Sequence, residues 1–435
     1  MELTPILCLE LGVAFVLAVA ILWTKVEYGL FLYGLALGFP DIAFPLGDTI
    51  NIRVDDVLIL LFLARTILWT PHAPSPRQWD IFKWQAIFLG VCLLSIAAES
   101  ASGMPPGAYE TVKMAGCAAI LFVIPRLLQS ERRMQFLIVG LMCGGIALLI
   151  QIRGHLNDFS SNQIANFQEL KGAATFSTWN PNTMGQAGLL LAFGAGLGGI
   201  LFSKTRANKI LWPSLAMGFA LVPAVMFVRG TTLSIAAGFV AFLFLLRRWR
   251  WILVFAVACL CVVLYVHART PQLLEDATAV NLATGEGFSH RFDRWGMAFQ
   301  GIQTRPLLGQ GFGQELPYLT LIGSEGRAHD AYLAVWLELG LGGLLLFLTA
   351  VFQFVRTGFF LYGRPRFQTH GALILALLLA LSLDSLGLPT LYWEKLPTIA
   401  LSLAVALVGL CQREAPEIAA NGIRSPAYAP VASHL

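Results

Sequence analysis

Polar residues that could do chemistry stand at the edges of the apolar segments of this chain. Arg229 lies in "AVMFVRGTTLSIAAG", where two apolar segments meet with almost no loop between them. A guanidinium in such surroundings needs an anionic partner or access to water. Gly230-Thr231-Thr232 opens the next segment, and the free N–H groups at a helix start would add to an anion site. The simpler interpretation is that Arg229 only snorkels to an interface.

A second group lies in "SHRFDRWGMAFQGIQTRPLLGQGFG", where the pattern predicts a helix over 290–304. Arg291 and Arg294 are one turn apart on it, on neighbouring faces. Trp295 and Phe299, at positions i and i+4, can seat the helix at a membrane interface. The alternative is an amphipathic surface helix whose arginines are merely solvated.

The third group precedes an apolar run in "GRAHDAYLAVWLELGLGGLLLFL". A histidine with an ordinary pKa of about 6.5 suits a general base, although His329 could also be an interfacial side chain without chemistry. Asp330 could be the N-cap of the helix. Glu338 is a carboxylate inside the apolar run, which is costly unless it is protonated, paired or facing a cavity. Asn182, in "NPN", begins another apolar run and could be only part of a turn with a cap.

Membrane helices must position these residues. The chain has 435 residues, 57% of them hydrophobic and only 12% charged, which excludes a soluble globular protein. Apolar runs near the roughly 20 residues needed to cross a bilayer recur along nearly the whole length, whereas a transmembrane barrel would show short alternating segments. The seven cysteines all fall in apolar runs and are interpreted as core residues.

We therefore predict an all-α, polytopic membrane bundle of about 12 to 13 helices over residues 1–413. Residues 414–435 are rich in Pro and Ala and are predicted to form a disordered cytoplasmic tail. The expected spans are 5–23, 27–39, 56–70, 84–98, 111–128, 134–152, 182–202, 210–228, 231–246, 251–267, 331–354, 371–388 and 396–411.

Basic residues predict the orientation of this bundle. Lys and Arg concentrate in short connections, which marks the cytoplasmic face. The long connections, including 40–55, 153–181 and the longest, 268–330, then lie on the opposite face, and long loops in compact proteins are usually functional or disordered. The short basic connections carry Arg126, Arg132, Arg133, Lys204, Arg206, Lys209, Arg247, Arg248, Arg250, Arg356, Arg364 and Arg366.

Several chemistries have no support in the sequence. It contains no D-x-D pair, H-E-x-x-H, Walker loop or G-x-S-x-G. We therefore expect no metal and no cofactor, and chemistry that rests on arginine, histidine and carboxylates.

Four stretches in this order resemble the O-antigen ligase and O-antigen polymerase superfamily, membrane glycosyltransferases of the GT-C class. They are "WNPNTMGQ", "VRGTTLSIAAG", "RFDRWGMAFQGIQTRPLLGQGFG" and "AHDAYLAVWLELGLGGLLLF". The resemblance covers roughly residues 174–348, including the predicted periplasmic loop 268–330 with its short helices. One departure is Asp330, where the family usually has Asn.

The resemblance implies transfer of a glycan from an undecaprenyl-pyrophosphate carrier to an acceptor hydroxyl at the periplasmic face of the bacterial inner membrane. Arg229 and Arg291 match the family's pyrophosphate-binding arginines, and His329 matches its essential histidine. Guanidinium groups suit these roles because they bind a departing pyrophosphate in bidentate fashion. The donor already stores the energy, so the expected reaction is metal-independent and inverting. Supporting roles are expected for Asp330, Asn182, Arg294, Trp295 and Glu338.

The acceptor stays open at this point. Lipid A core, another glycan repeat or a protein side chain would make the chain a ligase, a polymerase or a protein O-oligosaccharyltransferase. Membrane lipid is an expected partner and nucleic acid is not. A different class of function is a lipid-linked glycan flippase or another polysaccharide transporter, which often shows paired repeats and broken helices. No convincing repeat is present and the Arg and His residues gather at one face, which favours an enzyme.

Overall fold

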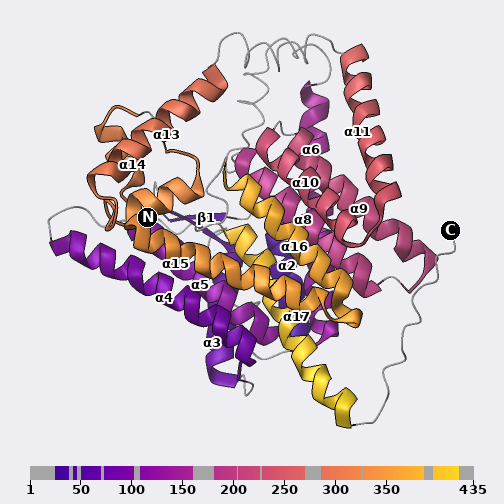
Figure 1. Cartoon of the computed structure of the whole chain (residues 1–435). Coiled ribbons are helices and arrows are strands. Elements are labelled where there is room, and N and C mark those ends of the chain that lie inside the picture. Colours follow the sequence, from indigo (N-terminus) through magenta and orange to yellow (C-terminus); the bar gives the residue numbers. More distant parts are fainter. Residues whose placement is uncertain are drawn as a thin grey trace, which may run out of the picture.

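Helices make up most of the computed structural model, which describes residues 25–38, 43–46, 50–69, 73–101, 108–159, 181–202, 204–225, 228–269, 286–324, 327–386 and 395–420 (Figure 1). The first expected span, 5–23, lies outside these residues. The helices are α2 (Val26–Gly38), α3 (Val54–Trp69), α4 (Pro76–Ala101), α5 (Ala108–Leu127), α6 (Glu131–Phe159), α8 (Pro181–Phe202), α9 (Arg206–Val225), α10 (Arg229–Leu245), α11 (Trp249–Arg269), α13 (Glu286–Thr304), α14 (Glu315–Leu321), α15 (Ala331–Tyr362), the 3₁₀ turn η1 (Pro365–Phe367), α16 (Gln368–Asp384) and α17 (Lys395–Ala420).

Every span expected beyond residue 25 overlaps one of these helices, although α4, α6, α15 and α17 extend seven to nine residues beyond the expected bounds. Among the described residues, six segments are long and apolar enough to cross a membrane, and α2, α3 and α10 contain shorter apolar stretches. The chain is therefore a helical membrane protein, while the expected total of about 12 to 13 helices stays a prediction. The six segments lie in α4, α6, α8, α15, α17 and the stretch from η1 through α16.

Two short strands are the departure from helical structure in the described part of the chain. β1 (Ala43–Leu46) and β2 (Ile50–Arg53) pair antiparallel, with Phe44 opposite Ile52. They fall in the expected long connection 40–55, where Ile50, Ile52 and Phe44 favour extended backbone. At the other end, α17 continues past Arg413 to Ala420, and residues 421–435 lie outside the described residues.

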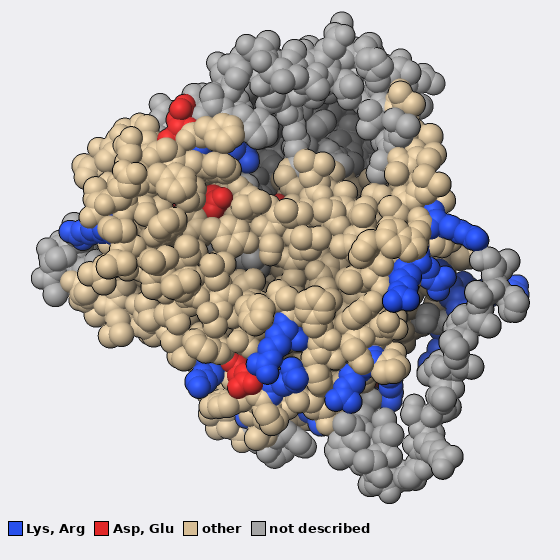
Figure 2. Space-filling view, in the orientation of Figure 1, with Lys and Arg blue, Asp and Glu red and all other residues tan. Residues whose placement is uncertain are grey.

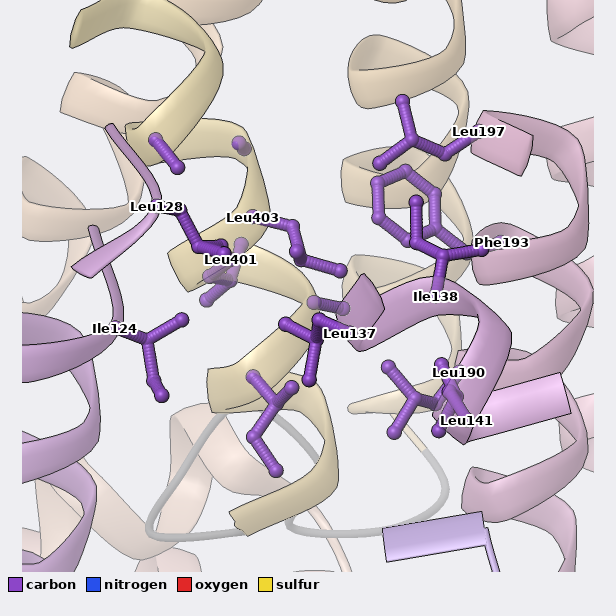
Figure 3. Close-up of a cluster of buried hydrophobic side chains, with 14 of the residues drawn as sticks. Ile124, Leu128, Leu137, Ile138, Leu141, Leu190, Phe193, Leu197, Leu401 and Leu403 are labelled. Carbon is purple, nitrogen blue, oxygen red and sulfur yellow. The ribbon is translucent and has the colours of Figure 1, made fainter. Parts of the chain in front are cut away.

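One part of the hydrophobic core forms where apolar side chains of α5, α6, α8 and α17 meet. Figure 3 shows Ile124 of α5, Leu137 of α6, Phe193 of α8 and Leu403 of α17 facing one another, and each is at most 5% exposed. α17 is the most enclosed of the candidate spans, with 89% of its apolar window buried against 22% for α4. Thus α17 is a central helix of the bundle and α4 a peripheral one.

Small residues allow α2 and α6 to pack backbone against backbone. Gly34 and Gly38 on α2 face Gly140 and Gly144 on α6, and a methyl group at Gly140 would overlap the carbonyl oxygen of Phe31. This spacing of small residues is typical of membrane helices, whose association depends on close van der Waals contact.

The bundle has two chemically different ends. α10 and α15 begin at the end that carries His329, which we call the site end. Their other termini meet where the Tyr362 hydroxyl donates a hydrogen bond to the Leu245 carbonyl, 2.7 Å away. Arg247, Arg248 and Arg364 follow there, and we call this the basic end. In Figure 2, Lys and Arg gather along the lower and right-hand margins of the molecule.

Candidate functional site

Helix termini converge at the site end through contacts between segments that are distant in sequence. The Thr231 hydroxyl of α10 donates to Asp384 at the end of α16, 2.7 Å away, and both side chains are buried. The next residue, Ser385, accepts a hydrogen bond from the Ala331 N–H at the start of α15, at 2.9 Å. These two bonds tie the helix that begins at Arg229 to the helix preceded by His329.

The start of α8 packs against the start of α10. A methyl group at Gly185 would lie 3.1 Å from the Thr231 hydroxyl and 3.1 Å from a methyl of Val228. Only a small residue at this position lets the first turn of α8, which contains Asn182, approach the first turn of α10. The starts of α8, α10 and α15 thus share one region, and each contributes the positive end of a helix dipole.

Arg229 is the first residue of α10, one residue before the helix start expected at Gly230. Its N-cap, Val228, makes no side-chain capping hydrogen bond, so the first amides of α10 are not satisfied by a cap side chain. Such a helix start is suited to an anion. The side chains of Arg229 and Asn182 lie outside the described part of the structure, so their contacts stay predictions.

His329 has an unusual backbone conformation. Its φ is +56°, in the left-handed region. A residue held there costs on the order of 1–3 kcal/mol and persists only where its surroundings demand it. Hydrogen bonds fix both flanking residues, Ala328 and Asp330, and thereby maintain this backbone conformation.

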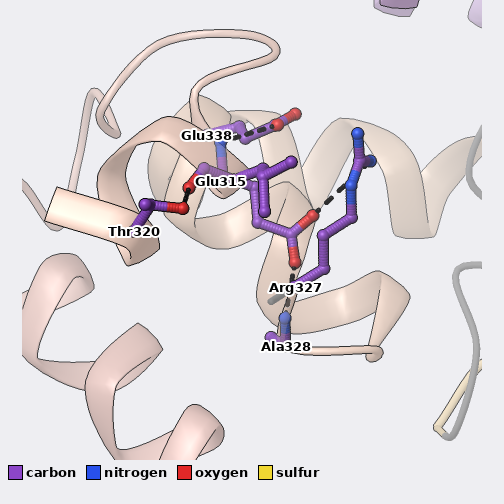
Figure 4. Close-up of polar contacts among 6 residues, drawn as sticks. Glu315, Thr320, Arg327, Ala328 and Glu338 are labelled. Carbon is purple, nitrogen blue, oxygen red and sulfur yellow. Dashed lines mark hydrogen bonds and ion pairs between the residues drawn. The ribbon is translucent and has the colours of Figure 1, made fainter. Parts of the chain in front are cut away.

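Ala328 is held on both sides of its peptide. Its N–H donates to Oε1 of Glu315 at 2.9 Å, and its carbonyl accepts from the Trp295 indole N–H of α13 at 3.0 Å. Glu315 is the first residue of α14 and is buried, and its Oε2 lies 3.8 Å from Nη1 of Arg327. Figure 4 shows Glu315 reaching both Arg327 and Ala328. Trp295, expected to anchor its helix at an interface, is therefore seen to hold the segment next to His329.

Asp330 is the N-cap of α15. Its Oδ1 accepts from the Tyr332 N–H at 2.9 Å and the Leu333 N–H at 2.8 Å, and the side chain is buried. Burial raises the pKa of this carboxyl above its ordinary value, while the two backbone hydrogen bonds act in the opposite direction. Asn is as good an N-cap as Asp, so the departure from the family pattern leaves this contact intact.

Three arginines act electrostatically on the imidazole of His329, which is half-buried. Burial lowers its pKa below the ordinary 6.5, and Arg294, Arg291 and Arg327 lower it further, in that order. The structure thus brings together His329, Arg291 and Arg294, as expected, and adds Arg327. With a depressed pKa, the imidazole is neutral at pH 7 and can accept a proton.

Arg291 and Arg294 sit differently on α13. Arg291 is exposed and Arg294 is half-buried. Desolvation, followed by the like charge of Arg294, lowers the pKa of Arg291, but a guanidinium stays charged at neutral pH. Arg291 is consequently a charged group that can reach a ligand in solvent, while Arg294 has the stronger electrostatic effect on His329.

Glu338, within α15, contacts the start of α14. It is buried, and its Oε1 accepts a hydrogen bond from the backbone N–H of Glu315, at 3.2 Å. Among the described residues, Glu338 is therefore linked to His329 through Glu315 and Ala328.

A break in α15 lies close to Glu338 and brings the Gly-rich segment after α13 against this part of the helix. Gly340 has φ +68° and ψ −173°, which interrupts the helix two residues after Glu338. The carbonyl oxygens of Leu337 and Glu338 accept instead from the N–H groups of Gln310 and Gly311, at 2.7 and 2.8 Å. The Gly-rich segment after α13 thus replaces the hydrogen bonds that the broken helix lacks.

Sequence reasoning missed Glu315 and Arg327. A signal was present, because Glu315 is the lone carboxylate in "GFGQELPYLTLIG", directly after the third family stretch. The sequence also did not indicate that Asp384 pairs with Thr231. Within the described part of the chain, no group of three or more His, Cys, Asp or Glu could hold a metal ion.

The fold and the site together define a helical membrane protein with an arginine-rich site where several helices begin. Residues 224–348 match the family model Wzy_C, described as O-antigen ligase. This match includes Arg229, Arg291, Arg294 and His329. This match confirms the resemblance to the O-antigen ligase and polymerase superfamily over residues 224–348. Comparison with curated proteins gave no match.

Proposed function

We propose that this protein transfers a glycan from a polyprenyl-pyrophosphate carrier to an acceptor hydroxyl, without a metal ion and with inversion at the anomeric carbon. The observation that supports this most is the half-buried His329, which has a depressed pKa and lies among Arg291, Arg294 and Arg327. Such a site offers a neutral base beside a cluster of cations, which is what a pyrophosphate leaving group requires.

In the proposed reaction, His329 accepts the proton of the acceptor hydroxyl as that oxygen attacks the anomeric carbon. The new glycosidic C–O bond forms while the bond between the anomeric carbon and the phosphate oxygen breaks. The electron pair leaves with the polyprenyl pyrophosphate. Arg229 and Arg291 bind this pyrophosphate on the opposite side of the sugar, together with the uncapped amides at the start of α10.

A second role for His329 is that of a cation that binds the pyrophosphate. The depressed pKa argues against it, because an imidazole among three arginines resists taking up a further positive charge. Arginine already supplies permanent charge in this site, so a neutral histidine adds a function that the arginines lack.

We further propose that the site faces the periplasm of a bacterial inner membrane. The support is the position of the short basic connections, since Arg247, Arg248 and Arg364 lie at the end opposite His329. Basic connections mark the cytoplasmic face of membrane proteins. Ligase, polymerase and protein O-oligosaccharyltransferase activities differ only in the acceptor, and the site described here serves each of them.

The test is transfer by the purified protein in proteoliposomes, with a synthetic undecaprenyl-pyrophosphate-linked glycan and a panel of the three acceptor types. Wild type should form a glycosidic bond with one acceptor, and His329→Ala should lower the rate by on the order of 100- to 10,000-fold. Arg229→Lys keeps the charge but loses bidentate binding, so most activity should be lost while the protein still accumulates in the membrane.

A transporter predicts a different result in the same vesicles. Movement of the labelled glycan lipid across the bilayer, with no transfer to any acceptor and no effect of His329→Ala, would replace the enzyme with a flippase. Transfer at the wild-type rate by Arg229→Lys would remove that arginine from the pyrophosphate site.

A further inference from the structure

The basic end of the bundle contains a cavity that the proposed reaction does not use. It has a volume of about 650 Å³ and lies between the start of α4, the end of α15 and the part of α17 from Gly409 to Arg413. Arg77, Arg364 and Arg413 line it, together with Gln78 and Phe360. A cavity of this size can hold a small ligand or a lipid headgroup.

Two of the arginines share one aromatic ring. The guanidinium carbon of Arg77 lies 3.8 Å from the centre of the Phe360 ring, and that of Arg364 lies 5.3 Å from it. Stacking on an aromatic face fixes the plane of a guanidinium and leaves its N–H edge available to a ligand. The ring thus holds two cations in one place at the wall of the cavity.

Arginines predominate among the charged side chains described around this cavity. Within the described residues, Arg77, Arg364 and Arg413 make no ion pair. Arg356 and Arg364 repel Arg77, and Asp80 attracts it. Like charges gathered in a concave wall create a positive potential that an anion would relieve.

Hydrogen bonds fix the start of α4 against α17 at the wall of the cavity. Ser75 and Gln78 cap the start of α4 reciprocally, with the Ser75 N–H donating to Oε1 of Gln78 at 3.0 Å. The Gln78 amide then donates to the Val405 carbonyl of α17 at 3.1 Å. Gly409 makes this approach possible, because a side chain there would overlap the Gln78 amide. α4 therefore presents its positive helix end to the same cavity.

We propose that this cavity binds a phosphate-bearing anion, namely the headgroup of an anionic phospholipid in the leaflet at the basic end. Three arginines around one concave site match the oxygens of a phosphodiester, and basic pockets between membrane helices are places where such headgroups bind. The site is independent of the proposed transferase activity, since the length of α15 separates it from His329.

Binding is measured on the purified full-length chain in a zwitterionic detergent by titration with cardiolipin, phosphatidylglycerol, phosphatidylcholine and inorganic phosphate at constant ionic strength. Wild type should bind the two anionic lipids and not phosphatidylcholine. The double variant Arg77→Gln/Arg364→Gln should raise their Kd by at least about tenfold, because two charge-assisted contacts are lost. The matched control is Arg206→Gln/Arg248→Gln, two exposed arginines at the same end outside the cavity, which should change Kd by less than about twofold.

Because Arg77 and Arg364 also stack on Phe360, Arg413→Gln is measured in parallel, together with the melting temperature of each variant. This third variant has no aromatic contact and should also raise the Kd. Equal affinity in wild type and in all cavity variants would overturn the site. Binding of inorganic phosphate alone would overturn the headgroup proposal and leave a free-anion site.

Discussion

His329 illustrates how single contacts define this site at the scale of residues. The left-handed backbone of His329 is unfavourable by itself, so the contacts of its neighbours must maintain it. Glu315 and Trp295 hold Ala328 on one side, and the capping bonds of Asp330 hold the other. The imidazole is thereby presented to the arginines of α13 from a segment that cannot easily rotate.

The pH dependence of transfer should reveal the protonation state of His329. A general base loses activity as the pH falls through its pKa, which here lies below the ordinary histidine value of 6.5. Arg294→Gln removes one of the charges that depress this pKa, so the acidic limb of the kcat/KM profile should move to higher pH. The exposed Arg305→Gln, after α13, serves as the matched control and should leave the limb in place. An activity that instead declines as the pH rises through this range would identify a cationic histidine.

Glu315 is predicted to be a positioning residue. Glu315→Ala leaves the Ala328 N–H without its acceptor, so the histidine should lose its position and kcat should fall by on the order of 100-fold. Glu315→Gln keeps an acceptor oxygen and should retain most of kcat. It also removes the charge opposite Arg327, so the acidic limb should shift to lower pH. If both variants lower only the amount of folded protein, with unchanged kcat and pH profile per molecule, Glu315 has a purely structural role.

At the scale of elements, the break in α15 joins the helix to the Gly-rich segment after α13. The Leu341 N–H donates to the Pro306 carbonyl at 2.9 Å, and the Trp336 indole N–H donates to the same oxygen at 3.2 Å. Leu341 directly follows the interruption at Gly340, and Trp336 lies about one helical turn before it. In a membrane, unsatisfied backbone groups are costly, so this exchange of hydrogen bonds stabilises an otherwise unfavourable helix.

Gly340→Ala should therefore destabilise the protein. With φ +68° and ψ −173°, Gly340 occupies a backbone region that is essentially restricted to glycine, so an alanine there costs on the order of 1–3 kcal/mol, and its methyl group would also overlap the carbonyl oxygen of Leu307. The melting temperature in detergent should fall, and transfer activity should fall with it because Glu338 and Glu315 move. Gly342→Ala is the matched control, since a methyl group there meets nothing within 4 Å and alanine favours helix. Equal melting temperatures for the two variants would show that the break contributes nothing to stability.

At the scale of the whole molecule, the site end and the basic end lie on opposite sides of one helical bundle. This arrangement predicts that the two ends face different compartments. A cysteine at Leu321, which is 83% exposed, should react with a membrane-impermeant thiol reagent in intact spheroplasts, and a cysteine at the exposed Arg248 should not. Leu321 is a better position than the nearby Ser324, which is buried. Labelling is compared with that of the unmodified chain, and the reverse pattern would place the site in the cytoplasm.

The sequence by itself determined the features that depend on neighbouring residues. Apolar runs locate the helices because a membrane span must be long and apolar. The helix start at Arg229, the helix of Arg291 and Arg294, and the cap at Asp330 follow from local patterns in the same way, and the structure confirms each of them. The grouping of these residues with His329 came from the resemblance to a family.

Only the tertiary structure decided which distant residues complete the site. Thr231 and Asp384 are 153 positions apart, and Trp295 and Ala328 are 33 apart, so no local periodicity relates either pair. The partners of the buried Glu315 could not be predicted from the sequence either, because a single carboxylate without a neighbouring basic residue indicates no particular contact. Its contacts with Arg327, Ala328 and Glu338 arise because the broken helix α15 and the Gly-rich segment pack together, and packing between elements places side chains that sequence separates.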